Sequence, residues 1–325
     1  MQSKAIQHLA VVMGGYSAER EISLQSGAMA MKHLASAGYK VYEVILDEKE
    51  WYGYVDQERH LINKDDFSLG GIVFDAVFVA VHGTPGEDGL LQAYFKLLDI
   101  PHTTCSSFEA ALTFNKVRCN ALLSAWKIPV AKSEFLPLSR EIDEDEIIAS
   151  LGLPCFVKPN RAGSSFGVSK VKSSSELLPA IRSARVHDEE VVVESFLDGV
   201  EVTCGVMDLY GKIEALPITE IVSENEFFDY QAKYEGASQE ITPARISEEA
   251  TEKIKRRACE IYELLSLRGV VRCDFIYTKD EAYLIEVNTV PGLTEGSLVP
   301  QQVIEAGYNL ADFFQAMVLR ALRTP

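Results

Sequence analysis

The sequence predicts an α/β protein whose C-terminal part has α+β organisation. The first hundred residues alternate β-branched runs with helical stretches, a βαβ rhythm typical of an open parallel sheet covered by helices. From about residue 191, apolar positions alternate with polar ones, as they do in strands of an antiparallel sheet. With 325 residues the chain has room for two or three domains, and we divide it into 1–104, 105–190 and 191–325.

Apolar runs and helix-ending glycines predict the elements of the first domain. The run at 72–81 is nearly continuous and β-branched, which is typical of a strand buried on both faces. Gly38 provides a C-terminal stop for the helix before it. The expected strands are 9–13, 40–46 and 72–81, and the expected helices are 22–37 and 90–98.

The same signals predict the elements of the other two domains. A long polar stretch at 223–243 has little periodicity, so we expect a loop there. The expected strands are 154–158, 168–171, 191–196, 201–208, 212–216, 270–277 and 282–287. The expected helices are 107–126, 174–185 and 247–265.

Composition and charge argue against several classes of protein. A net charge of −17 disfavours non-specific contact with nucleic acid and with anionic membranes, so we expect neither as a partner. The six cysteines form no CxxC pair, which favours reduced thiols in a cytoplasmic protein. The first residues lack the cleavage site of a signal peptide, and no stretch approaches the roughly 20 apolar residues of a membrane span.

The most informative segment is a predicted hairpin near the C-terminus. Its first strand carries Arg272 and Asp274 on one face, and its second carries Glu286 and Asn288 on one face. If the strands pair around Lys279–Asp280, three oxygen ligands converge, and that set suits Mg²⁺. The alternative is the solvated polar face of an edge hairpin, which seldom combines these residue types in so apolar a sequence.

Two loops rich in glycine and small polar residues are candidates for anion binding. At 156–167, Lys158 lies on a strand, and the Gly/Ser loop after it can cover phosphates, although the segment lacks the Gly-Lys-Ser/Thr of a P-loop. An ordinary hairpin is the alternative for this segment. At 288–300, backbone N–H groups and the Ser297 hydroxyl can bind an anion, but taken alone this loop is merely a turn.

Two further loops follow strands of the first sheet, at the edge where open α/β sheets bind ligands. The segment 14–20 lacks the GxGxxG of a dinucleotide fold, which argues against NAD. Its Glu19 can bind a ligand ammonium group or favour the N-terminus of the next helix, and the sequence supports both equally. In 82–89, His82 lies in a structured loop, where a lone histidine is more often structural than catalytic.

Together these segments resemble the D-alanine–D-alanine ligase family of the ATP-grasp superfamily. The motifs, in chain order, are GGYSAEREISLQSG (14–27), HGTPGEDG (82–89), VKPNRAGSSFGVSKV (157–171), EEVVVESFLDGVEVT (189–203), FFDYQAKY (227–234), RCDFIY (272–277) and EVNTVPGLTEGSLVP (286–300). The resemblance implies an ATP-grasp fold and a ligase that joins two D-alanine molecules through an acyl phosphate, for peptidoglycan synthesis. It also implies ATP as co-substrate, two Mg²⁺ or Mn²⁺ ions and a homodimer.

The resemblance implies a role for each matching residue. The residues that would bind ATP are Lys116, Lys158, Ser164, Ser165, Glu194, Phe196, Leu197, Glu201 and Lys233. The residues that would bind the D-alanine substrates are Glu19, His82, Arg272, Gly292, Ser297 and Leu298. The residues that would hold the metal ions are Asp274, Glu286 and Asn288. The residues that would act in catalysis are Glu19, Ser164, Lys233, Tyr234, Arg272 and Gly292.

A lid over the site is also expected, because water would destroy an acyl phosphate. The long loop 223–243 contains Lys233 and Tyr234 and is the natural candidate. Tyr234 would join Ser164 and Glu19 in one hydrogen-bonded set.

Two other functions are weighed against this one. A related ligase forms a D-alanyl–D-lactate ester, but relatives of that kind tend to lack a tyrosine at position 234. A nucleotide-binding regulator has no need of Arg272 as an oxyanion donor. The chain departs from the family pattern at Thr84–Pro85, Val290 and Glu295–Gly296, which bear on substrate affinity or loop mobility and leave every expected metal and phosphate residue in place.

Overall fold

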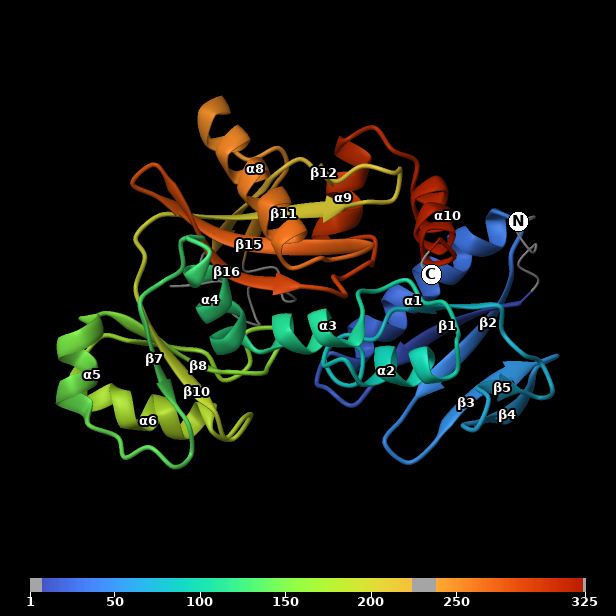
Figure 1. The fold of residues 1–325 in the computed structure, drawn as a ribbon, viewed down its shortest axis with the longest axis horizontal. Coiled ribbons are helices and arrows are strands. Elements are labelled where there is room, and N and C mark those ends of the chain that lie inside the picture. The colour runs from blue at the N-terminus through green and yellow to red at the C-terminus, as the bar shows by residue number, and fades with distance from the viewer. Residues whose placement is uncertain (1–7, 224–237, 324–325) are drawn as a thin grey trace.

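The computed structural model describes residues 8–223 and 238–323, which form three sheets covered by helices (Figure 1). The first sheet lies on the right of the view, the four-stranded sheet at the lower left, and the third sheet above them. Mixed α/β architecture with separate antiparallel sheets in the C-terminal half confirms the predicted fold class.

The first sheet is mixed rather than parallel throughout. Its strands in spatial order are β5 (Ser68–Leu69), β4 (Glu58–Asn63), β3 (Trp51–Val55), β2 (Lys40–Leu46), β1 (His8–Gly14) and β6 (Ala76–Val79). Only β2, β1 and β6 run parallel, and β3 to β5 add an antiparallel meander. The expected open parallel sheet is therefore wrong at this edge, because hairpin connections reverse the chain there. Asp56 and Gln57 form one such turn, both with positive φ.

Two helices of the first hundred residues and the last described helix cover the first sheet. They are α1 (Arg20–Ser36), α2 (Leu90–Leu97) and α10 (Leu310–Ala321). α10 packs beside α1, and Phe313 and Phe314 enter the same apolar core as Leu9 and Phe78 (Figure 1). The last helix thus completes the N-terminal core. The strand expected at 72–81 is shorter than predicted, because Ile72 closes a turn against Leu69 instead of joining the sheet.

A single helix was expected at 107–126, and this prediction is wrong. The chain forms α3 (Ser107–Phe114) and α4 (Lys116–Ala125), with a break at Asn115. Asn115 has extended backbone angles and caps α4, since its side-chain oxygen accepts the Arg118 N–H at 3.0 Å. The break makes Lys116 the first residue of α4, where its side chain reaches the cavity described below.

The second sheet is antiparallel and has four strands. Their spatial order is β7 (Ser133–Leu136), β10 (Val191–Ser195), β8 (Cys155–Pro159) and β9 (Ser169–Val171). The helices α5 (Glu144–Leu151) and α6 (Ser174–Ala184) bury their apolar sides against it. The expected division at residue 190 places β10 in a different domain from β7 and β8, the two strands with which it pairs.

The third sheet carries the predicted hairpin. Its strands are β14 (Ser238–Ile241), β13 (Thr219–Ser223), β11 (Val200–Met207), β15 (Val270–Thr278) and β16 (Glu281–Asn288), and β12 (Glu214–Ala215) pairs with β11. The helices against it are α8 (Glu248–Leu264) and α9 (Leu298–Glu305). A loop was expected over 223–243, but 238–241 form a strand paired with β13.

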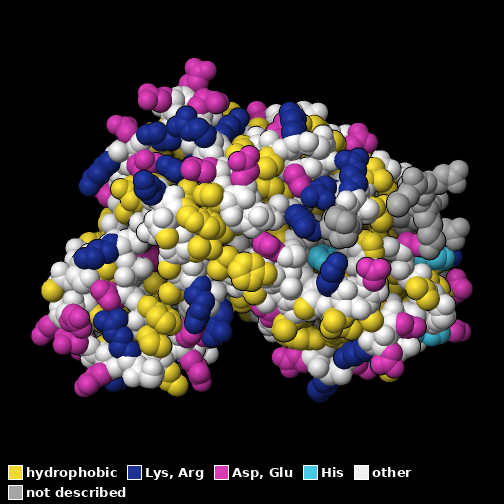
Figure 2. Space-filling model, in the orientation of Figure 1, with side chains coloured by type: hydrophobic (Ala, Val, Ile, Leu, Met, Phe, Trp, Pro, Cys, Tyr) yellow, Lys and Arg dark blue, Asp and Glu magenta, His cyan; other side chains and the backbone are white. Residues whose placement is uncertain are grey.

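Surface charge is intermixed on the face drawn in Figure 2, where Lys and Arg lie among Asp and Glu. In the part of the chain that the structure describes, no helix combines the length and the apolar character needed to cross a membrane.

Candidate active site

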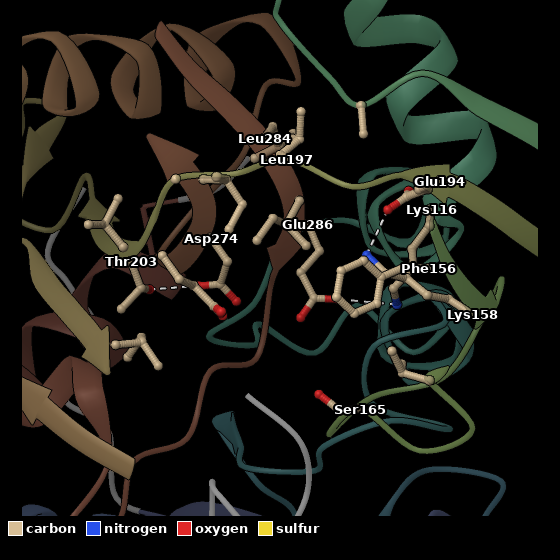
Figure 3. A pocket seen from close by; sticks show the side chains of 18 of the residues that line it. Lys116, Phe156, Lys158, Ser165, Glu194, Leu197, Thr203, Asp274, Leu284 and Glu286 are labelled. Carbon is tan, nitrogen blue, oxygen red and sulfur yellow. Dashed lines mark hydrogen bonds and ion pairs between the residues drawn. The ribbon is translucent and has the colours of Figure 1, made fainter. Parts of the chain in front are cut away.

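A cavity of about 480 Å³ lies between the four-stranded sheet and the third sheet (Figure 3). Strands β8, β10, β11, β13, β15 and β16 supply most of its walls, together with the Gly/Ser loop at 162–168. The expected site residues that line it are Lys116, Lys158, Ser165, Glu194, Phe196, Leu197, Glu201, Arg272, Asp274, Glu286 and Leu298. The fold therefore brings to one cavity residues expected to bind ATP, residues expected to bind substrate and residues expected to bind metal ions.

Two of the lysines that line the cavity are each paired with a carboxylate. Lys158 Nζ donates to Glu194 Oε2 at 2.7 Å. Lys116 Nζ lies 3.2 Å from Glu286 Oε2 and donates to the Ala162 carbonyl at 2.8 Å. Burial lowers the pKa of Lys158, but the nearby carboxylates, led by Glu194, together outweigh burial and raise the pKa above its ordinary value. The Lys158 ammonium is thus able to exchange its carboxylate partner for a phosphate.

The hairpin pairs around Lys279 and Asp280 as expected, and its polar face points into the cavity. Asp274 lies opposite Glu286 in the register, and Arg272 lies opposite Asn288. Arg272 Nε and Nη2 each donate to one Asp274 oxygen at 2.8 Å. The Asn288 amide donates to Asp274 Oδ2 at 3.1 Å. Arg272, Asp274 and Asn288 therefore form one connected group, and Glu286 faces the same cavity rather than a solvated edge.

Thr203 is a member of this group that the sequence reasoning missed. Its Oγ1 donates to Asp274 Oδ1 at 2.6 Å, and the residue is buried (Figure 3). β11 places Thr203 opposite Asp274 in the register. The sequence carried a signal for Thr203. It follows Glu201, an expected ATP-binding residue, by two positions, and so lies on the same face of the strand.

The expected metal residues offer the oxygen chemistry that Mg²⁺ prefers. Two carboxylates and one amide are hard ligands, and Mg²⁺ usually binds one or two carboxylates together with substrate phosphates. Within 8–223 and 238–323, no group of three or more His, Cys, Asp or Glu side chains is arranged to hold a metal. A metal site on Asp274, Glu286 and Asn288 stays a prediction.

Glu19 of the first domain meets the Gly/Ser loop of the second. Ser164 Oγ donates to Glu19 Oε1, and a Cβ on Gly163 would lie 2.4 Å from Glu19 Oε2. Glu19 is the N-cap residue of α1, and its side chain makes no capping hydrogen bond to the helix, so both of its expected roles stay open. Ser164 and Ser165 have φ values of 47° and 57°, a strained left-handed conformation typical of functional loops.

His82 is buried, and both of its ring nitrogens are engaged. Nδ1 lies 2.8 Å from the Val290 carbonyl, and Nε2 lies 3.0 Å from Ser26 Oγ. Burial lowers the pKa of His82. A neutral imidazole without a free nitrogen favours a structural role, so the expected contact of His82 with substrate has no support in this arrangement.

The loop after β16 places the last expected substrate residues. Ser297 Oγ accepts the Thr294 N–H at 3.0 Å and closes a short turn before α9. Leu298 is the first residue of α9 and lines the cavity. A Cβ on Gly292 would lie 2.8 Å from Ser297 Oγ, which explains the glycine. Lys233 and Tyr234 lie outside the described residues.

These sheets and this cavity define an ATP-grasp ligase. The chain matches two family descriptions, D-ala D-ala ligase N-terminus over residues 8–105 and D-ala D-ala ligase C-terminus over residues 122–319. A D-alanine–D-alanine ligase of Flavobacterium johnsoniae is 50% identical over 315 residues, which cover 95% of this chain and 97% of that protein. The chain belongs to the D-alanine–D-alanine ligase family.

Solved structures are similar over nearly the whole chain. The VanG D-Ala:D-Ser ligase from Enterococcus faecalis has a TM-score of 0.86 at 32% identity and covers 97% of this chain and 99% of its own. A D-alanine–D-alanine ligase from Bacillus anthracis complexed with ATP has a TM-score of 0.81 at 27% identity, with 98% of each chain covered. The fold is therefore shared by ligases whose names state different second substrates.

Proposed function

We propose that this protein uses ATP to join two D-alanine molecules into D-alanyl-D-alanine for peptidoglycan synthesis. One observation carries the proposal: Lys116 and Lys158 share a cavity with the Arg272, Asp274 and Glu286 side chains. Groups suited to phosphates and to a developing oxyanion thus face the same space. Family membership and the similarity to a ligase complexed with ATP support ATP as the co-substrate.

The first step activates a carboxylate. A carboxylate oxygen of the first D-alanine attacks the γ-phosphorus of ATP, and the bond to ADP breaks to leave an acyl phosphate. We assign Lys116 and Lys158 to the phosphates, since both are cations that line the cavity. Glu19 is assigned to the ammonium group of this D-alanine. The Ser164 hydroxyl holds the Glu19 carboxylate in place. The adenine pocket is assigned to Glu194, Phe196 and Leu197, and the ribose to Glu201.

The second step forms the peptide bond. The amine of the second D-alanine attacks the acyl carbon, and the electrons of the broken C–O bond leave with phosphate. Arg272 and the Gly292 N–H are assigned to the tetrahedral oxyanion, because donors aimed at developing charge lower the barrier most. Ser297 and the Leu298 N–H, at the N-terminus of α9, are assigned to the carboxylate of the second D-alanine.

The donor set of Asp274, Glu286 and Asn288 fits two Mg²⁺ or Mn²⁺ ions that also take phosphate oxygens. When bound, such ions neutralise the oxygens of the phosphates during transfer. The chain's own contribution is orientation: Thr203 and Arg272 fix Asp274, and Lys116 holds Glu286. Formation of a homodimer, location in the cytoplasm, and the roles of Lys233 and Tyr234 in a lid over 223–243 remain predictions.

A spectrophotometric assay of ADP release tests the proposed function. We expect ADP and phosphate only when ATP, Mg²⁺ and D-alanine are all present, because each supplies a reacting or neutralising group. D-Serine or D-lactate added beside D-alanine tests whether the acceptor differs. Equal turnover with L-alanine, or turnover without a divalent cation, would show that the proposal is wrong. Nucleotide binding without any release of phosphate would support a regulator instead.

A further inference from the structure

Three buried polar side chains of the first domain hold the backbone of the loop that follows β16. Ser26 of α1, His82 and Glu87 are 0%, 4% and 8% exposed. We call these three residues the backbone clamp. Each is separated from the loop by more than 200 positions in sequence. The tertiary fold, and not local structure, therefore places these three side chains beside the loop.

The clamp forms hydrogen bonds to the loop backbone on both sides of Gly292. Val290 is held at both ends of its backbone: its N–H donates to Glu87 Oε1 at 3.3 Å, and its carbonyl lies 2.8 Å from His82 Nδ1. The Leu293 N–H donates to Ser26 Oγ at 3.2 Å. Gly292, the residue assigned to the oxyanion, lies between these anchored positions. Its orientation is therefore set by side chains from another domain.

One assignment of protons satisfies both His82 and Ser26. Neutral His82 donates from Nδ1 to the Val290 carbonyl and accepts the Ser26 hydroxyl proton at Nε2, 3.0 Å away. The second Glu87 oxygen accepts the Gly83 N–H at 2.8 Å. Buried polar groups cost free energy unless they are paired, so this network specifies one position for the loop.

We propose that Ser26, His82 and Glu87 are positioning residues that aim the Gly292 N–H at the oxyanion that develops in the second step. This proposal rests on the proposed function. It predicts a selective defect: the first step, at the γ-phosphate, proceeds when the loop shifts, whereas attack by the amine loses its oxyanion donor.

Ser26→Ala tests the clamp, and Ser23→Ala is its matched control. Ser23 lies on the same helix, is equally buried, and bridges the Gly14 N–H and the Ala80 carbonyl at 2.8 Å each, but it does not touch the loop. Two rates are measured on one sample. Dipeptide formation reports both steps, and scrambling of oxygen-18 from the β,γ-bridge of ATP in the presence of D-alanine reports reversible phosphoryl transfer alone.

For Ser26→Ala we expect dipeptide formation to fall by about 10- to 100-fold while scrambling is retained, since small misplacements of reacting groups cost on this scale. The ratio of the two rates does not depend on how much of the sample is folded, and Glu87→Gln should shift it in the same direction. A proportional fall in both rates, or a ratio equal to that of Ser23→Ala, would overturn the clamp. A wild-type chain that neither scrambles label nor forms dipeptide would instead overturn the proposed function.

Discussion

Glu286→Gln should lower the rate of dipeptide formation by about 10³-fold while the protein stays folded. Glu286 lies opposite Asp274 in the hairpin register and carries a carboxylate of the expected metal set. The amide keeps the size of the side chain and removes its charge. Without this charge the transition state loses several kcal/mol of stabilisation, which corresponds to a rate about 10³-fold lower. The coupled ADP assay measures the loss.

Calorimetry gives a second readout that needs no turnover. ATP should bind wild-type protein more tightly with Mg²⁺ than without it, and Glu286→Gln should remove most of this difference. Glu281→Gln is the control, because Glu281 begins the same strand and pairs with Arg257 at 3.3 Å, away from the cavity. A folded Glu286→Gln protein with wild-type rates would show that the metal assignment is wrong.

Arg272→Lys should lower kcat by about 10²- to 10³-fold, the range for losing one oxyanion donor. Arg272 uses two nitrogens to hold both Asp274 oxygens at 2.8 Å, and a lysine ammonium cannot reproduce this planar fork. The substitution keeps the positive charge, so a large fall in kcat would show that the planar shape of the guanidinium group is needed. Steady-state kinetics that vary D-alanine separate kcat from KM.

Arg320→Lys is the matched control for this change. Arg320 lies on α10 and holds Asp208 at 2.8 Å outside the cavity, so the same substitution there should leave kcat unchanged. If Arg272→Lys raised only KM, Arg272 would be a substrate-binding group rather than an oxyanion donor.

Local signals made much of the site predictable. Period-two spacing placed Arg272 with Asp274, and Glu286 with Asn288, and the turn at Lys279–Asp280 has the positive φ angles of a tight hairpin. The lysine of the Gly/Ser segment lies on a strand, as expected. These features follow from neighbours in sequence, which is why patterns of charge and polarity were enough.

Features set by distant parts of the chain were not predictable in this way. β10 follows the antiparallel pattern of the third sheet, yet its partners are β7 and β8. The break at Asn115 is fixed partly by Asn160, whose carbonyl accepts the Lys116 N–H at 3.2 Å. The backbone clamp likewise depends on packing between domains. The pattern of residues within one segment does not predict contacts between segments that are distant in sequence.

The origin of the oxygen in released phosphate tests the central claim most directly. D-Alanine labelled with oxygen-18 in its carboxylate is incubated with the protein, ATP and Mg²⁺, and the phosphate is analysed by mass spectrometry. Activation as an acyl phosphate transfers one carboxylate oxygen to phosphorus, so we expect one labelled oxygen in each phosphate formed with dipeptide. Unlabelled phosphate, or label in AMP, would contradict the proposed mechanism.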